Sequence, residues 1–159
     1  RTFYSVNFLK DHLRMRGWYE VYQCRSNMPN VILLSGNAVQ LPELIKHADV
    51  IILQNVLIDG NGRDTELMWK YKGGELECSD REWGALTERF RQAEEDAYRG
   101  FLKVAKLGHI VRFGRPERDK AFKKMLVGKL GVEPTRIQAK KLLYDETREV
   151  WEAYFIDNS

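Results

Sequence analysis

The chain has 159 residues, of which 43% are hydrophobic and 31% are charged, with a net charge of +3. This composition excludes a disordered chain, and no apolar run reaches the ~20 residues of a membrane span, so we expect no membrane partner. The length predicts a single α/β domain over residues 1–159. Because the first residue is arginine, that domain could be excised from a longer chain.

The cysteines and histidines predict neither a disulfide framework nor a zinc site. Cys24 and Cys78 show no CxxC spacing, and the three histidines are far from one another in sequence. Two free thiols are typical of a reducing, cytoplasmic compartment. The cysteines and histidines therefore support no prediction of a particular metal.

The first half of the chain alternates between helical and strand patterns. Residues 5–16 show helical spacing of apolar side chains, and residues 19–24 are rich in aromatic and β-branched types. The apolar run 31–36 predicts a buried strand, residues 41–48 a short helix, and residues 49–58 a second apolar strand. Strand, helix and strand in this order predict a parallel βαβ unit.

Residues 67–78, "LMWKYKGGELEC", alternate with period two on both sides of Gly73 and Gly74. A β-hairpin with a glycine turn fits this pattern. The sequence therefore predicts a second element of sheet after the βαβ unit.

A long helix is predicted after the hairpin. Ser79 and Glu82 form the S-x-x-E pattern of a capping box, and Gly108 follows the end of the helical pattern. One stripe of spacing three and four runs along it: Trp83, Leu86, Phe90, Ala93, Ala97, Gly100 and Val104. The stripe indicates core or partner contact, and the charged flank 89–96 is expected to face solvent.

The last third is predicted to be mainly helical. Residues 109–114 suggest one more strand, and residues 117–130 and 134–155 suggest two helices. The expected fold class is thus α/β. It comprises a small parallel-containing sheet (the βαβ unit plus the hairpin), a long helix and a helical C-terminal third.

The acidic loop 58–66, "IDGNGRDTE", is the first candidate site. Loops after buried parallel strands form ligand crevices, so Asp59, Asp64 and Glu66 are candidate catalytic residues. They could hold a divalent metal such as Mg²⁺, or one carboxylate could act as nucleophile or general base. The alternative is a turn in which the side chains serve backbone geometry.

Residues 48–67, "ADVIILQNVLIDGNGRDTEL", resemble the acid-bearing loop of nucleoside 2-deoxyribosyltransferases. In that family an Asp and a Glu follow an apolar strand, and the resemblance implies that Glu66 would be the nucleophile. The glycine-rich opening strand of the family has no counterpart at residues 1–8.

The basic segment 112–141 is the second candidate site. It holds ten basic and three acidic residues, a local charge of +7, which favours a phosphate-bearing partner. Within residues 126–143, a glycine turn at Gly131 followed by Val132 and Ile137 matches a helix-turn-helix, so we interpret residues 112–155 as a basic helix-turn-helix-like subregion. The candidate nucleic-acid contacts are Arg112, Arg115, Arg118, Lys123, Lys124, Lys129, Arg136, Gln138, Lys140 and Lys141.

Three hypotheses follow. The leading one is a nucleic-acid-binding domain, for DNA or RNA, that uses the basic C-terminal helix pair. The second is an enzyme acting on nucleotides or nucleic acid, either a metal-dependent nuclease or a nucleoside transferase or hydrolase, with the acidic loop as its site. The third is a protein-interaction domain that docks a partner through the long central helix.

Overall fold

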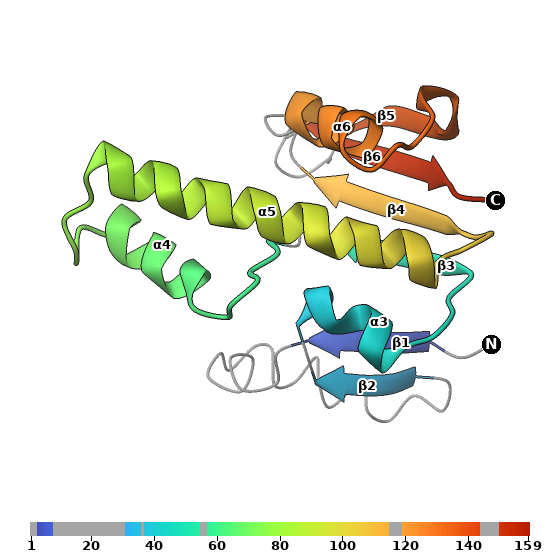
Figure 1. The fold of residues 1–159 in the computed structure, drawn as a ribbon, viewed down its shortest axis with the longest axis horizontal. Helices are drawn as coiled ribbons and strands as arrows, with labels where there is room; N and C mark the ends of the chain where they lie inside the picture. The colour runs from blue at the N-terminus through green and yellow to red at the C-terminus, as the bar shows by residue number, and fades with distance from the viewer. Residues whose placement is uncertain (1–2, 8–30, 36, 55–56, 115–118, 144–149) are drawn as a thin grey trace.

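The computed structural model describes residues 3–7, 31–35, 37–54, 57–114, 119–143 and 150–159 (Figure 1). Its strands are Phe3–Asn7 (β1), Val31–Ser35 (β2), Val50–Gln54 (β3), His109–Gly114 (β4), Ile137–Leu143 (β5) and Val150–Asp157 (β6). Its helices are Leu41–Leu44 (α3), Asp64–Lys72 (α4), Asp80–Val104 (α5) and Asp119–Gly128 (α6), with short 3-10 turns at Ala38–Gln40 (η1) and Pro134–Arg136 (η3).

The strands confirm the α/β class and the presence of parallel strand pairs. In the larger sheet, with strand order β3-β4-β6-β5, β3 and β4 are parallel and the other two pairs are antiparallel. β1 and β2 form a separate parallel pair. The predicted succession of strand, short helix and strand is present as β2, α3 and β3. The described pairings, however, join β2 to β1 and β3 to β4.

Helix α5 is the central element of the fold, as the sequence predicts. It runs the length of the molecule beside α4, α3 and the sheet (Figure 1). Leu86, Ala93, Ala97 and Val104 of the predicted stripe are buried inside the protein, whereas its other three positions are half-buried. Docking of a partner through this helix stays a prediction.

The predicted capping box starts α5. The Ser79 hydroxyl accepts a hydrogen bond from the Glu82 backbone N–H (3.2 Å), and a Glu82 carboxylate oxygen accepts one from the Ser79 backbone N–H (2.8 Å). The expectation of a fully solvated charged flank is wrong at Glu95, which is buried and pairs with Arg99 at 3.2 Å. A helix that packs against several elements buries more than one stripe.

Helices α5 and α6 cover one face of the sheet. Phe122 of α6 packs edge-to-face on Tyr98 of α5 and on Tyr154 of β6, with ring centroids 4.9 and 5.2 Å apart. Ile110 and Ile156, which are paired across β4 and β6, are buried in the same cluster. This face therefore holds the core.

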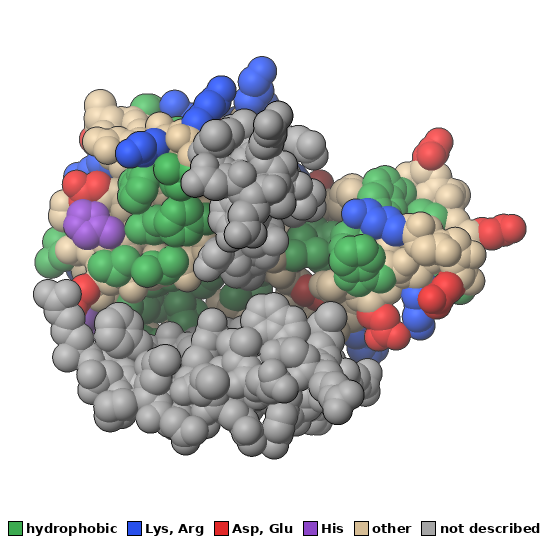
Figure 2. Space-filling model, turned by 180° about the vertical axis from the view of Figure 1, so that it is seen from behind, with side chains coloured by type: hydrophobic (Ala, Val, Ile, Leu, Met, Phe, Trp, Pro, Cys, Tyr) green, Lys and Arg blue, Asp and Glu red, His purple; other side chains and the backbone are tan. Residues whose placement is uncertain are grey.

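The opposite face of the sheet is more open. Ile52 on β3 and Phe155 on β6 both align with Val111 on β4, so the three side chains share one face. Ile52 is 67% exposed and Phe155 is 39% exposed. Figure 2 shows the molecule from behind, where hydrophobic side chains gather on the surface.

The predicted hairpin at residues 67–78 is wrong. Its first half belongs to α4, which continues to Lys72, and Gly73 and Gly74 form a turn after the helix. The side chains that α4 buries are Asp64 and Met68, which are four residues apart as a helix requires. Trp69, within the alternating segment, is 63% exposed.

The helix predicted for residues 134–155 is also wrong, and with it the helical C-terminal third. Gly131, in the left-handed region at φ +69°, turns the chain after α6, and the 3-10 turn η3 leads into β5. β5 and β6 then pair antiparallel. Lys140 and Lys141 lie on β5, an edge strand of the sheet, where charged side chains disfavour pairing with a further strand.

Part of the N-terminal prediction lies outside the described residues. The helix expected at residues 5–16 is wrong at its start, because Phe3–Asn7 is a strand, and its remainder and the strand expected at 19–24 are not described. Cys78 is a free thiol, as predicted. No helix in the described part of the chain is both long and apolar enough to span a membrane.

Candidate functional site

The acidic loop after β3 is organised around the buried side chain of Asp59. One carboxylate oxygen accepts hydrogen bonds from the backbone N–H groups of Asn61 (3.2 Å) and Gly62 (2.9 Å). The other accepts one from the backbone N–H of Thr65 (2.9 Å), in the first turn of α4. Asp59 therefore holds the loop and the start of the helix in place, which is the turn geometry expected of Asx residues.

Asp64 and Glu66 have different surroundings. The Asp64 carboxylate is buried and accepts three hydrogen bonds of 3.0–3.2 Å from the guanidinium of Arg89, which ties α4 to α5. These bonds raise the pKa of Arg89. Glu66 is exposed and pairs with Lys70 one turn later, at 3.1 Å. The three acids do not converge, and their catalytic role stays a prediction.

Metal binding was the second expectation for this loop. Among the residues that the structure describes, no group of three or more His, Cys, Asp or Glu side chains is placed to hold a metal ion. Binding of Mg²⁺ at the loop stays a prediction. The described contacts give Asp59 and Asp64 structural roles.

Asn37, which follows β2, connects that strand to the acidic loop. It is buried just after β2, and its side-chain amide donates a short hydrogen bond to the backbone carbonyl of Asp59. Its side-chain oxygen accepts from the backbone N–H of Val39 (3.1 Å) and so caps η1. The carboxyl ends of β2 and β3 are thereby held together, a connection that no sequence motif indicated.

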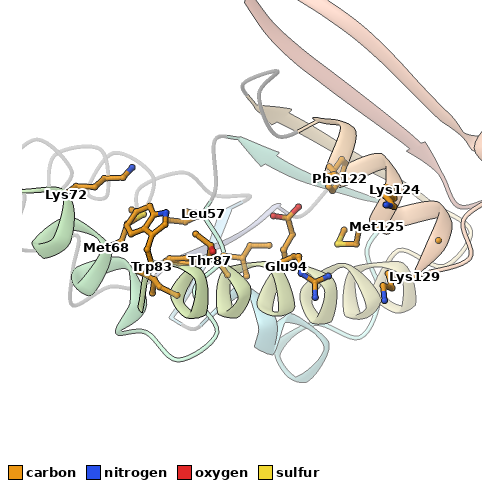
Figure 3. A pocket seen from close by; sticks show the side chains of 16 residues that line it. Leu57, Met68, Lys72, Trp83, Thr87, Glu94, Phe122, Lys124, Met125 and Lys129 are labelled. Carbon is orange, nitrogen blue, oxygen red and sulfur yellow. The ribbon is translucent and has the colours of Figure 1, made fainter. Parts of the chain in front are cut away.

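A cavity of about 820 Å³ lies beside the loop, between α4, α5 and α6 (Figure 3). Leu57 and Ile58, which follow β3, form part of its wall, and α6 follows β4. The cavity therefore lies at the carboxyl ends of the parallel strands β3 and β4. Asp59, Asp64 and Glu66 do not line it.

The cavity wall is mainly apolar and aromatic, with a few charged side chains. Trp83 and Phe90 of α5 and Phe122 of α6 contribute rings. The charged residues that line it are Lys72, Arg91, Glu94, Lys124 and Lys129. Apolar walls with a small number of polar groups are the usual composition of a small-molecule site.

Glu94 is the acid of the cavity. It comes from α5, is half-buried, and in Figure 3 its carboxylate points away from the helix into the space between α4 and α6. One turn along the helix, burial raises the pKa of Tyr98, and the charge of Glu94 raises it further. Sequence reasoning missed Glu94 because it treated the charged flank as solvated. The available signal was its position four residues after Phe90, on the cavity side of the stripe.

The residues expected to bind nucleic acid come from different elements of the fold. Arg112 points into the protein, with its guanidinium carbon 4.1 Å from the centroid of the Phe122 ring. Lys123, Lys124 and Lys129 are exposed on or just after α6, whereas Arg136, Gln138, Lys140 and Lys141 are exposed at η3 and on β5. Arg115 and Arg118 lie outside the described residues.

Neither a protein-family model nor a curated protein matches this sequence. Solved structures do share its fold. A precorrin-8w decarboxylase from Methanobacterium thermoautotrophicum aligns with a TM-score of 0.55 and 14% identity, over 98% of this chain and 69% of that chain. The methyltransferase domain of bacterial CtHen1-CN aligns with a TM-score of 0.54 and 9% identity, over 98% of this chain and 77% of that domain.

These neighbours correct the leading hypothesis of a nucleic-acid-binding domain with a helix-turn-helix. The second helix of the motif is a strand, and the fold is one found in enzymes. The chain has a mixed α/β fold that these two solved structures share.

Proposed function

We propose that this protein is an enzyme that transfers a methyl group to a small molecule bound in the cavity between α4, α5 and α6. The observation that carries the proposal is the position of the cavity. In open α/β sheets, ligands bind outside the carboxyl ends of the strands, and this cavity borders the ends of β3 and β4. The methyltransferase domain among the structural neighbours supports the choice of reaction.

Methyl transfer requires a donor and an acceptor held in line. The carbon–sulfur bond of a sulfonium donor breaks as the acceptor atom attacks the methyl carbon, and an acceptor O–H or N–H group loses its proton. Glu94 is placed to take that proton, because its carboxylate points into the cavity. The apolar rings of Trp83 and Phe122 exclude water and orient the acceptor.

The test is to measure transfer of a labelled methyl group from S-adenosylmethionine to a set of small-molecule acceptors by the purified protein. We expect turnover that Glu94→Gln lowers by about 10²-fold, the usual scale of a general base. Thr87→Phe, which places a ring in the cavity from the exposed face of α5, should block acceptor binding. Lys103→Gln, an exposed change near the far end of α5, is the control. Absence of both donor binding and methyl transfer would exclude the proposal.

A further inference from the structure

The charges of the cavity are unequal. Four of its lining side chains are basic, Lys72, Arg91, Lys124 and Lys129, and only Glu94 is acidic. The lining therefore carries an excess of three positive charges among mainly aromatic and aliphatic side chains. All four basic residues are exposed, so their charges lie at the mouth of the cavity, where clustered positive charge attracts anions from solution.

The cations differ in how far they are already neutralised. Arg91 donates a hydrogen bond of 2.8 Å to Glu88 and is held by that acid. Lys124 and Lys129 form no ion pair with any residue that the structure describes. The hydrogen bond from Arg91 lowers the pKa of Glu88, and the nearby charge of Lys129 lowers it a little further. Lys124 and Lys129 are therefore available to a ligand.

The arrangement of these groups gives the cavity a direction. Figure 3 shows Lys72 at the α4 end, Lys124 and Lys129 at the α6 end, and Glu94 between them. Lys72 lies 5.7 Å from the ring centroid of Trp69, so a cation–π contact steadies it at its end. A ligand that fills this space places its charged end at α6 and its apolar body along α5.

We propose that the substrate is an aromatic or conjugated anion whose carboxylate or phosphate group pairs with Lys124 and Lys129. Its apolar body packs against Trp83, Phe90 and Phe122. This inference rests on the proposed function, since it assigns the substrate class of the same cavity. A neutral ligand would gain nothing from the two exposed ammonium groups, and a cationic one would be repelled by them.

Calorimetric titration with four naphthalene probes tests the substrate class. The probes share one ring system and differ in charge: 2-naphthoate, 2-naphthyl phosphate, 2-naphthamide and 2-naphthylmethylamine. We expect both anions to bind at least tenfold more tightly than the amide, and the amine to bind more weakly than the amide. The comparison of the two anions decides between carboxylate and phosphate as the charged group.

Variants locate the effect. Lys124→Met and Lys129→Met keep the apolar stem of each side chain and remove its charge, so each should weaken anion binding about fivefold without changing amide binding. Lys120→Met is the matched control, because Lys120 is exposed on the same helix and does not line the cavity. It should leave all four affinities unchanged.

The remaining outcomes each overturn a defined claim. Equal binding of the anions and the amide, lost in Thr87→Phe, would refute the anionic substrate and leave the cavity as the site of the proposed function. Anion binding that neither lysine variant weakens would refute the assignment of Lys124 and Lys129. Absence of binding by every probe would refute the cavity as a ligand site, and with it the proposed function.

Discussion

Replacing Asp64 with asparagine separates an architectural role of the acidic loop from a catalytic one. Asp64→Asn keeps the size of a side chain that is only 7% exposed and removes its charge, which now meets three hydrogen bonds from Arg89. A hydrogen bond to a charged group contributes about 1.5–3 kcal/mol. The Arg89 side chain is 46% exposed, so water replaces part of the lost contact.

We therefore expect Asp64→Asn to lower the free energy of unfolding by about 2 kcal/mol, or about 4–8 °C in the melting temperature of a chain of this size. Urea unfolding followed by circular dichroism measures it. Glu66→Gln is the control, because Glu66 is 73% exposed and pairs with a surface lysine. That change should cost less than about 0.5 kcal/mol.

The opposite result would refute this reasoning. Acids gathered for catalysis or metal binding repel one another in the free protein, so their removal commonly stabilises the fold. A higher melting temperature for Asp64→Asn than for wild type would show that the ion pair with Arg89 does not stabilise the protein. The catalytic prediction for the loop would then regain support.

Two further predictions concern backbone packing and pH. In Gly108→Ala, the added Cβ would lie 2.3 Å from the backbone oxygen of Asp49, so we expect the free energy of unfolding, measured in urea, to fall by about 3 kcal/mol. In Gly84→Ala, nothing lies within 4 Å of the added Cβ in an exposed part of α5, so the free energy of unfolding should rise by about 1 kcal/mol. Equal effects of the two alanines would contradict the close approach of Gly108 to the backbone of Asp49. Hydrogen bonds from Ser79 lower the pKa of Glu82 below its ordinary 4.5, so the cap stabilises α5 fully above that value and weakens as the pH falls through the lowered pKa. Thermal melts of Ser79→Ala should therefore show a smaller loss of stability than wild type on acidification over that range, and an identical loss would count against the cap.

The elements that could be predicted from sequence are those in which local pattern and tertiary packing agree. Helix α5 has a capping box and a continuous apolar stripe, and Ala93, Ala97 and Val104 of that stripe belong to the core. Strands β3 and β4 have short β-branched runs that a sheet buries on at least one side. In these segments no competing pattern was present.

The segments that were wrong have local patterns that tertiary contacts override. In α4, the burial of Met68 and the contact of Asp64 with Arg89 on another helix decide the conformation, and neither is visible in the alternation around Trp69. In residues 137–143 and 150–157, the pairing of β5 with β6 decides the conformation, because such a pairing depends on residues distant from any local window.

The candidate site could be predicted from sequence only in part, for the same reason. The sequence placed a site at the carboxyl end of β3, which agrees with the position of the cavity, but it selected the acids of the loop. Those acids are the conspicuous polar residues there, and they bind backbone groups and Arg89 instead. Glu94 and Lys124 reach the cavity from two helices that are far apart in sequence, so only the packing of α5 on α6 brings them together.

The most direct test of the cavity as the ligand site is fluorine NMR of protein labelled with 5-fluorotryptophan, titrated with 2-naphthoate. Trp83 lines the cavity, whereas Trp69 is 63% exposed on α4 and does not line it. Trp83→Phe and Trp69→Phe assign the two resonances. The account predicts a saturable shift of the Trp83 resonance that Thr87→Phe abolishes, with the Trp69 resonance unchanged. A Trp83 resonance that stays fixed while calorimetry records binding would contradict it.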